Sequence, residues 1–278
     1  MSECNSCPSN KGCTKDKKEC MIENNPLNNV KKIIGVMSGK GGVGKSSISV
    51  LIAKRLKELG YKTGILDADI TGPSIPRLVG LKDVKVVSDE EEELMHPVDT
   101  NDGIKVMSLN LLLENENDPV IWRGPIIGNV VKEFWMDVLW GELDYLVIDM
   151  PPGTSDVALT VMHTIPINGI VMVSVPQDLV SMIVSKAVKM VRAVNVDVLG
   201  VIENMSYITC PDCGKKIKLF NGESTTKFLE EMNLKLLGEI PVLDSVGNLS
   251  DPTYKDEDKH LEKVFNPIVE NIIKSLEK

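Results

Sequence analysis

The glycine-rich segment GKGGVGKS at residues 39–46 limits the possible folds of this chain more than any other feature. It fits the pattern G-x-x-x-x-G-K-[ST], follows an apolar run and precedes a stretch with helical spacing. Glycines let a backbone approach phosphate groups closely, and the free N–H groups at a helix start attract anions. The segment predicts a phosphate-binding loop in which Lys45 pairs with the β- and γ-phosphates and Ser46 coordinates Mg²⁺.

Short apolar runs recur along the chain and alternate with helical patterns. The runs lie at residues 33–37, 63–66, 104–109, 145–148, 169–175, 198–202 and 236–240. Most are continuous, which is typical of strands that are buried on both faces. Helical spacing occurs at residues 46–59, 180–194 and 225–232. With the phosphate loop, this alternation predicts an α/β fold of the P-loop NTPase type, with a doubly wound and mostly parallel sheet.

Charge and hydropathy exclude several classes of partner. The chain has 31 Lys and Arg against 40 Asp and Glu, a net charge of −9, whereas general nucleic-acid binders carry a basic surface. No apolar run approaches the roughly 18 residues of a membrane span. The first residues lack the basic and apolar regions of a signal peptide. We therefore expect no nucleic-acid partner, no membrane partner and a cytoplasmic location.

Three segments stand outside the alternation. Residues 1–28 are polar and lack periodicity, so we expect a flexible Cys-rich extension that orders only around a metal centre, ahead of a P-loop ATPase domain at residues 29–278. The acidic run at residues 89–93 is expected to form a solvated loop between two short strands. Residues 265–276 have an apolar stripe without a basic opposite face, which predicts a helix that docks on the sheet.

Two of the apolar runs end in carboxylates. Asp149 ends the run at residues 145–148, which is the Walker B pattern that holds Mg²⁺, and Gly153 follows with an N–H that can face the γ-phosphate. Asp67 and Asp69 end an earlier run. Ligands of such folds bind at the carboxyl ends of the strands. Both aspartates are therefore candidates for holding Mg²⁺ and positioning water.

Lys40, a second lysine early in the loop, makes the loop resemble that of the deviant Walker A ATPases, the MinD/ParA group. Four further segments narrow the resemblance to the Mrp/ApbC/Nbp family of cytosolic ATPases, which bind and transfer iron–sulfur clusters. They are WRGP at residues 122–125, LDYLVIDMPPGT at 143–154, VIENMS at 201–206 and CPDCG at 210–214. The resemblance runs from about residue 33 to the end of the chain, and several of the motifs are long enough to be specific.

The resemblance implies roles for the matching positions. Lys40 would reach across a homodimer to the partner's nucleotide, Asp69 would position the attacking water, and Asn204 would recognise adenine. Two cysteines from each chain, Cys210 and Cys213, would ligate a 4Fe–4S cluster at the dimer interface. Apo iron–sulfur proteins and cluster donors would be further partners. The resulting catalytic residues are Lys40, Lys45 and Asp69, and the Mg²⁺ ligands are Ser46, Asp67 and Asp149. The nucleotide-binding set is Gly39, Lys40, Gly41, Gly42, Val43, Gly44, Lys45, Ser46, Ser47, Gly153 and Asn204.

The residues themselves leave the metal at Cys210 and Cys213 open. Their C-x-x-C spacing is half of a four-thiolate site, and a two-fold axis would supply the other half from a second copy. Local alternatives are a redox disulfide, or a zinc site completed by Cys4 and Cys7. Lysines at positions 215, 216 and 218 are expected to favour the thiolates.

The N-terminal cysteines form a second candidate site, Cys4, Cys7, Cys13 and Cys20. One branch of the family has an N-terminal ferredoxin-like motif ending in C-x2-C-x5-C, which the first three match. The further upstream cysteine of that motif has no counterpart here. Either Cys20 serves as the fourth ligand, or the site is three-cysteine, labile or absent.

These features combine into one mechanistic hypothesis with two alternatives. ATP would draw two P-loops together in a homodimer, and Lys40 with the loops around Asp69 and Asp149 would couple the nucleotide state to the bridging cysteines. The first alternative is a positioning ATPase of the MinD/ParA kind that binds membrane or DNA. The second is an ATPase scaffold with a purely structural zinc ion.

Overall fold

The structure is a computed structural model. It describes residues 25–70, 72–89, 94–113, 115, 124–176, 178–218, 223–243, 246, 249 and 260–277. The N-terminal candidate site (Cys4, Cys7, Cys13 and Cys20) lies outside the described residues.

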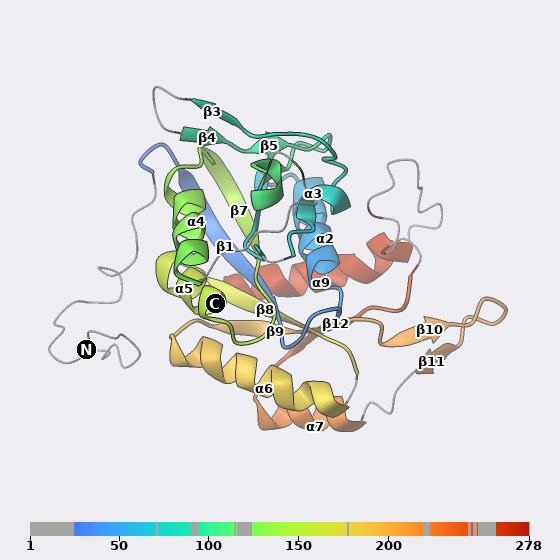
Figure 1. The fold of residues 1–278 in the computed structure, drawn as a ribbon. Coiled ribbons are helices and arrows are strands. Elements are labelled where there is room, and N and C mark those ends of the chain that lie inside the picture. The colour runs from blue at the N-terminus through green and yellow to red at the C-terminus, as the bar shows by residue number, and fades with distance from the viewer. Residues whose placement is uncertain are drawn as a thin grey trace, which may run out of the picture.

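A central eight-stranded sheet organises the molecule (Figure 1). Its order is β12-β9-β8-β1-β7-β2-β6-β5, and every pairing is parallel except that of β5 with β6. The strands are β1 (Asn29–Ser38), β2 (Thr63–Asp67), β5 (Val98–Asp99), β6 (Lys105–Ser108), β7 (Glu142–Asp149), β8 (Gly169–Ser174), β9 (Val198–Glu203) and β12 (Leu236–Glu239). Each predicted apolar run falls on one of the parallel strands, which confirms the predicted sheet.

Helices cover both faces of this sheet. They are α2 (Lys45–Glu58), α3 (Ile75–Leu78), α4 (Gly124–Met136), α5 (Asp156–Thr164), α6 (Asp178–Ala193), α7 (Glu223–Glu231) and α9 (His260–Leu276), with a 3₁₀ turn, η1, at Leu109–Leu111. The connection from β1 to β2 runs toward one edge of the sheet, whereas the connections from β6 to β7 and onward to β8, β9 and β12 run toward the other edge. Since such crossovers are right-handed, α2 lies on one face and α4, α5, α6 and α7 lie on the other. The contacts agree, since α9 packs against α2, α4 against α5, and α6 against α7. The fold is therefore doubly wound, as predicted.

The strands that flank the acidic run and the last helix also follow the predictions. Antiparallel strands β3 (Val87–Asp89) and β4 (Leu94–His96) flank the acidic run, of which residues 90–93 lie outside the description. In α9, the apolar side chains of Phe265, Ile268 and Ile272 are buried. This helix contacts β12, β9 and α2, so it docks on the sheet. Within the described part of the chain, no helix is long and apolar enough to cross a membrane.

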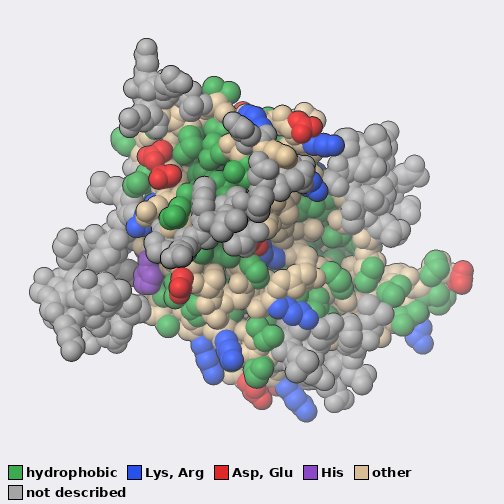
Figure 2. Space-filling view, in the orientation of Figure 1, with side chains coloured by type: hydrophobic (Ala, Val, Ile, Leu, Met, Phe, Trp, Pro, Cys, Tyr) green, Lys and Arg blue, Asp and Glu red, His purple; other side chains and the backbone are tan. Residues whose placement is uncertain are grey.

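A small antiparallel hairpin projects from the body of the molecule. Its strands are β10 (Tyr207–Thr209) and β11 (Lys216–Lys218), and they flank the C-x-x-C turn (Figure 1). Hydrophobic side chains appear on this projection in Figure 2. Ile208 and Ile217 of the hairpin are exposed, and they are cross-strand partners. The sequence did not predict these two strands, because each has three residues and neither forms an apolar run.

Candidate nucleotide site and cysteine hairpin

The phosphate loop joins the carboxyl end of β1 to the first turn of α2. Gly42 and Gly44 have φ angles of 78° and 84°, a region that glycine occupies without steric cost. A Cβ atom at Gly41 or Gly42 would meet nothing within 4 Å, so this part of the loop is open on its outer side. The helix begins with the Ile48 N–H donating to the Gly44 carbonyl oxygen at 3.0 Å. The loop therefore presents the N-terminal end of α2 at the edge of the sheet, as predicted for a phosphate site.

Beneath the loop, three side-chain donors converge on Asp149. The ammonium of Lys45 lies 2.8 Å from Asp149 Oδ2 and 3.4 Å from Asp69 Oδ2. Ser46 Oγ donates to Asp149 Oδ2 at 2.6 Å, and Ser49 Oγ donates to Asp149 Oδ1 at 2.7 Å. Asp149 is fully buried, so these charge-assisted bonds offset the cost of removing its carboxylate from water. Ser49 was missed by the sequence analysis, although its position four residues after Lys45 places both on one side of α2.

Asp67 lies beside this cluster because β2 pairs with β7 in a register that puts Asp67 opposite Asp149. It is fully buried, and its Oδ2 accepts hydrogen bonds from the Ile75 N–H at 3.2 Å and from Ser108 Oγ at 3.1 Å. Burial, followed by the nearby charge of Asp149, raises the pKa of Asp67 to about 8. The single positive charge of Lys45 is therefore too small to balance the negative charge of this group of carboxylates.

The donor set fits a magnesium ion. Carboxylate and hydroxyl oxygens are the ligands that Mg²⁺ prefers, and Asp67, Asp149 and Ser46 supply both types within one buried cluster. The residues that the sequence assigned to Mg²⁺ are thus brought together.

One of the predicted nucleotide contacts has another partner in this conformation. The Gly153 N–H donates to the Ser38 carbonyl oxygen at 2.8 Å, so a bond to the γ-phosphate would require it to exchange partners. The Lys40 carbonyl oxygen accepts a hydrogen bond from Ser38 Oγ at 2.9 Å, which ties the start of the loop to the end of β1. The lysine is half-buried. Its reach toward a second copy stays a prediction.

Asn204 also has a partner that the sequence analysis did not foresee. It follows β9 directly and is buried, and its Nδ2 donates to the carbonyl oxygen of Val43 in the phosphate loop at 2.9 Å. The amide is therefore part of the support for the loop. Adenine recognition by this residue stays a prediction.

The cysteine hairpin holds two thiols at its turn. The Cys210 N–H donates to the Lys215 carbonyl oxygen, and the Gly214 N–H donates to the Cys210 carbonyl oxygen, which closes the turn. Gly214 has a φ of 69°, which favours glycine there. Cys210 is half-buried and Cys213 exposed, and both thiols are free. In the described ranges, no group of three or more His, Cys, Asp or Glu side chains could hold a metal ion.

The pKa of the Cys210 thiol is lowered, but not by the cause that the sequence suggested. The backbone N–H of Cys213, then that of Asp212, and then the Cys213 thiol stabilise the Cys210 thiolate. The attribution to the neighbouring lysines is wrong for this thiol. The ammonium of Lys216 instead lies 4.2 Å from the centre of the Tyr207 ring, because the two side chains share a face of the hairpin.

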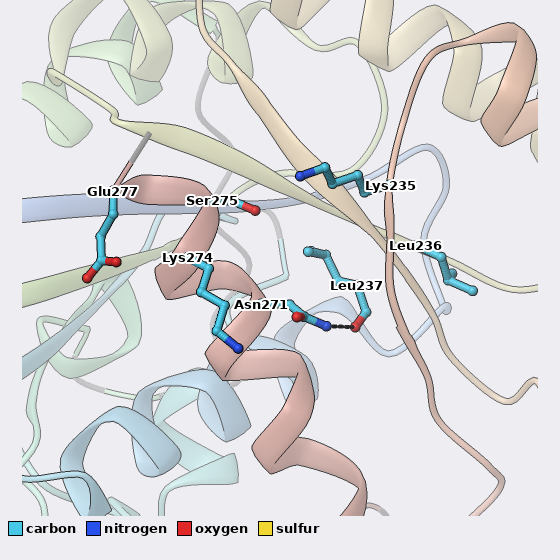
Figure 3. Close-up of a pocket in the computed structure, with 7 residues that line it drawn as sticks. All are labelled: Lys235, Leu236, Leu237, Asn271, Lys274, Ser275 and Glu277. Carbon is cyan, nitrogen blue, oxygen red and sulfur yellow. Dashed lines mark hydrogen bonds between the residues drawn. The ribbon is translucent and has the colours of Figure 1, made fainter.

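A separate groove lies away from this chemistry (Figure 3). It is formed by the beginning of β12 and the last turns of α9, and its lining is Lys235, Leu236, Leu237, Asn271, Lys274, Ser275 and Glu277. Asn271 Nδ2 donates to the Leu237 carbonyl oxygen at 3.0 Å, so part of the edge of β12 is capped. The phosphate loop is at the opposite, carboxyl end of the parallel strands, so this groove does not belong to the nucleotide site.

Comparison with known proteins assigns this chain to a family. A family model described as ParA, NUBPL iron-transfer P-loop NTPase, matches residues 29–273. An iron-sulfur cluster carrier protein of Clostridium perfringens is 49% identical over 245 residues, which cover 86% of this chain and 85% of that protein. A protein of the same name from Methanocaldococcus jannaschii is 39% identical over 284 residues, which cover 99% of this chain and 97% of the relative.

The solved structures agree with the fold. A nucleotide-binding protein from Archaeoglobus fulgidus in complex with ADP has a TM-score of 0.71 and 41% identity, and the match covers 84% of this chain and 92% of that one. The septum site-determining protein MinD of Pyrococcus horikoshii with Mg-ADP has a TM-score of 0.61 at 19% identity, with 88% and 96% covered, and it shows the fold alone. This chain belongs to the ParA family of NUBPL iron-transfer P-loop NTPases.

Proposed function

We propose that this protein is an ATP-dependent carrier of an iron–sulfur cluster. Two copies would hold one 4Fe–4S cluster between the thiolates of Cys210 and Cys213 of each chain, and would pass it to apo-proteins. The observation that carries the proposal is the position of both sites on one edge of the sheet. The phosphate loop follows β1 and the cysteine hairpin follows β9, and these parallel strands end at the same edge.

The nucleotide half of the proposal is hydrolysis of ATP at the β–γ bond. On nucleotide binding, the ammonium of Lys45 would exchange Asp149 for the β- and γ-phosphates, since those oxygens carry more charge than one carboxylate. Ser46, Asp149 and Asp67 would hold Mg²⁺, which neutralises the charge that develops on the phosphate oxygens. Asp69, whose Oδ2 lies 3.4 Å from the Lys45 ammonium, would orient the attacking water near the γ-phosphate.

The cargo half rests on the hairpin and on the relatives. The two thiols of the hairpin cannot by themselves complete a four-thiolate cluster site, but a two-fold axis through the hairpin supplies two more. The names of the relatives support an iron–sulfur cargo over the zinc alternative. Free thiols of this kind persist in the reducing cytoplasm, where apo iron–sulfur proteins and cluster donors are the expected partners.

The cargo is tested by reconstituting the protein with iron and sulfide without oxygen. We expect about four irons and four labile sulfides per dimer, with a visible charge-transfer spectrum. Cys210→Ser/Cys213→Ser should lose this cluster, while Lys216→Ala, in the same hairpin, should keep it. Zinc without labile sulfide in the wild-type protein would contradict the proposal. Iron that remains in the double variant would belong to the N-terminal cysteines.

The ATPase is tested separately. Lys45→Ala should abolish hydrolysis because it removes the ammonium that pairs with the transferred phosphoryl group. Lys54→Ala, further along α2, is the matched control and should hydrolyse ATP like the wild type. Equal hydrolysis by Lys45→Ala and wild type would show that the phosphate loop is not the catalytic site.

A further inference from the structure

One side chain joins the phosphate loop to the segment that leads into the cysteine hairpin. Asn204 Nδ2 donates to the Val43 carbonyl oxygen at 2.9 Å, and the residue is 2% exposed. The backbone N–H of Asn204 donates to the carbonyl oxygen of Ser174, at the end of β8, at 2.7 Å. The loop is therefore held by a side chain whose own backbone is fixed to the edge of the sheet.

This contact leaves no free space between the two segments. A Cβ atom added at Gly44 would lie 2.3 Å from Asn204 Nδ2 and 3.8 Å from Met205 Cε. Gly44 is thus packed directly against Asn204 and Met205. Close-packed groups transmit displacements to each other. A shift of the loop at Val43 and Gly44 must either move Asn204 or break its hydrogen bond.

Met205, the residue directly after Asn204, forms a stiff joint in the backbone. Met205 has a φ of 52°, a left-handed conformation that is uncommon for a residue of this type. Ser206, the next residue, is 2% exposed, its N–H donates to the Ile240 carbonyl oxygen at 2.9 Å, and its Oγ donates to Glu203 Oε2 at 2.8 Å. A backbone that is held in such a conformation is over-determined by its surroundings.

The hairpin begins at once after this joint. Tyr207 is the first residue of β10, and its carbonyl oxygen accepts a hydrogen bond from the Val242 N–H at 2.9 Å. Cys210 lies three residues further along the same strand and turn. From Asn204 to Cys210 the chain spans at most about 20 Å even when fully extended. Because the joint is stiff, a displacement of Asn204 would be passed on to β10, which leads into the turn that holds Cys210.

We propose that Asn204 is a positioning residue that sets the geometry of Cys210 and Cys213 according to the nucleotide state of the phosphate loop, with Met205 as the stiff joint. The inference rests on the proposed function, since it requires a loop that binds nucleotide and a hairpin that binds a cluster. In this proposal the nucleotide state acts on the cysteines through the contact of Asn204 with Val43. The sequence had suggested that it acts through Lys40 and the loops around Asp69 and Asp149. Because coupling between sites is reciprocal, a bound cluster must change the affinity for nucleotide by the same factor.

The test measures the alkylation rate of Cys210 in the reduced, cluster-free, full-length protein. Peptide-resolved mass spectrometry separates Cys210 from the other cysteines. Magnesium and a non-hydrolysable ATP analogue are added at saturation, and the ratio of the rates with and without nucleotide is taken. In the wild type we expect this ratio to differ from unity by about fivefold or more, the lower range of typical allosteric coupling.

The decisive variants change Met205, which is not one of the residues assigned to nucleotide binding. Met205→Gly keeps the left-handed conformation accessible but makes the joint flexible, so the ratio should approach unity. Met205→Asn is the matched control: it removes the same thioether, yet asparagine tolerates the left-handed conformation without glycine's freedom, so the ratio should stay like the wild type. Asn204→Ala should also lose the response at saturating nucleotide. Nucleotide affinity is measured for each variant.

Each outcome bears on one claim. A Met205→Gly protein that responds like the wild type overturns the inference, as does a wild type that binds nucleotide and assembles a cluster but shows no response at Cys210. A wild type that binds neither nucleotide nor cluster overturns the proposed function itself. The reciprocal measurement adds a second readout: cluster loading should change the nucleotide dissociation constant of the wild type and of Met205→Asn, and leave that of Met205→Gly unchanged.

Discussion

Asp149 shows how one buried residue organises the nucleotide site. Its carboxylate takes an ammonium and two hydroxyl donors from a single helix, because Lys45, Ser46 and Ser49 lie on one side of the first turns of α2. The protein's own donors thus hold the Asp149 carboxylate in one orientation. Such a preformed set lets binding energy go to the transition state instead of to ordering side chains.

Ser49→Ala tests this organisation. The change leaves Asp149 Oδ1 without its hydroxyl donor in a buried position, so we expect the free energy of unfolding to fall by about 1–3 kcal/mol. Chemical denaturation in the absence of nucleotide measures it. Ser47→Ala, two residues earlier and half-buried, should change the stability by much less. Equal stability of the two variants would mean that the Ser49 bond contributes nothing.

Asp67 predicts a pH dependence of the magnesium-free protein. Its pKa is raised from 3.8 to about 8 by burial and by Asp149, so the folded state keeps a proton that the unfolded state releases. Stability must therefore fall as the pH rises through this window, by up to about 1.4 kcal/mol per pH unit. Asp67→Asn should flatten the profile of the unfolding free energy between these pH values. A wild-type profile that rises with pH across the window would contradict the assignment.

At the scale of elements, register decides which side chains meet. Parallel pairing of β2 with β7 puts Asp67 opposite Asp149, and parallel pairing of β8 with β9 brings Asn204 to the same edge as the phosphate loop. Strand ends at a shared edge are where such folds bind their ligands. The site is therefore a consequence of the sheet order.

The hairpin of β10 and β11 makes its own prediction. Since backbone N–H groups of Cys213 and Asp212 lower the pKa of Cys210, its alkylation should reach half its maximal rate below the pH of an ordinary thiol. The labelling rate of the Cys210 peptide across pH measures this. Lys216→Ala should leave the profile unchanged, because that ammonium lies over the Tyr207 ring. A shift of the profile to higher pH in this variant would restore the lysine explanation.

The sequence predicted the elements whose signals are local. Buried parallel strands are continuous apolar runs, and the phosphate loop has a fixed pattern, so β1, α2 and Asp149 could be placed before the structure was known. Ser108 and Ser49 were missed because a serine in a strand or helix has no signal until a partner from elsewhere in the chain meets it. The contact of Asn204 with Val43 joins residues 161 positions apart, and it depends on the sheet order alone.

At the scale of the whole molecule, two sites with different chemistry share one rigid edge. The carboxylate cluster beneath the phosphate loop is buried, while the cysteine turn projects away from the body on a hairpin (Figure 1). A projecting pair of thiols can meet a second copy, whereas a buried pair could not. This arrangement suits a carrier that must both hold a cluster and release it.

Native mass spectrometry of the reconstituted protein under anaerobic conditions tests the central claim most directly. The account predicts a dimer that carries one 4Fe–4S cluster in addition to any N-terminal metal, and its loss to cluster-free monomers in Cys210→Ser/Cys213→Ser. A monomer that retains a complete cluster or a zinc ion at Cys210 and Cys213, with no bridged dimer, would contradict it.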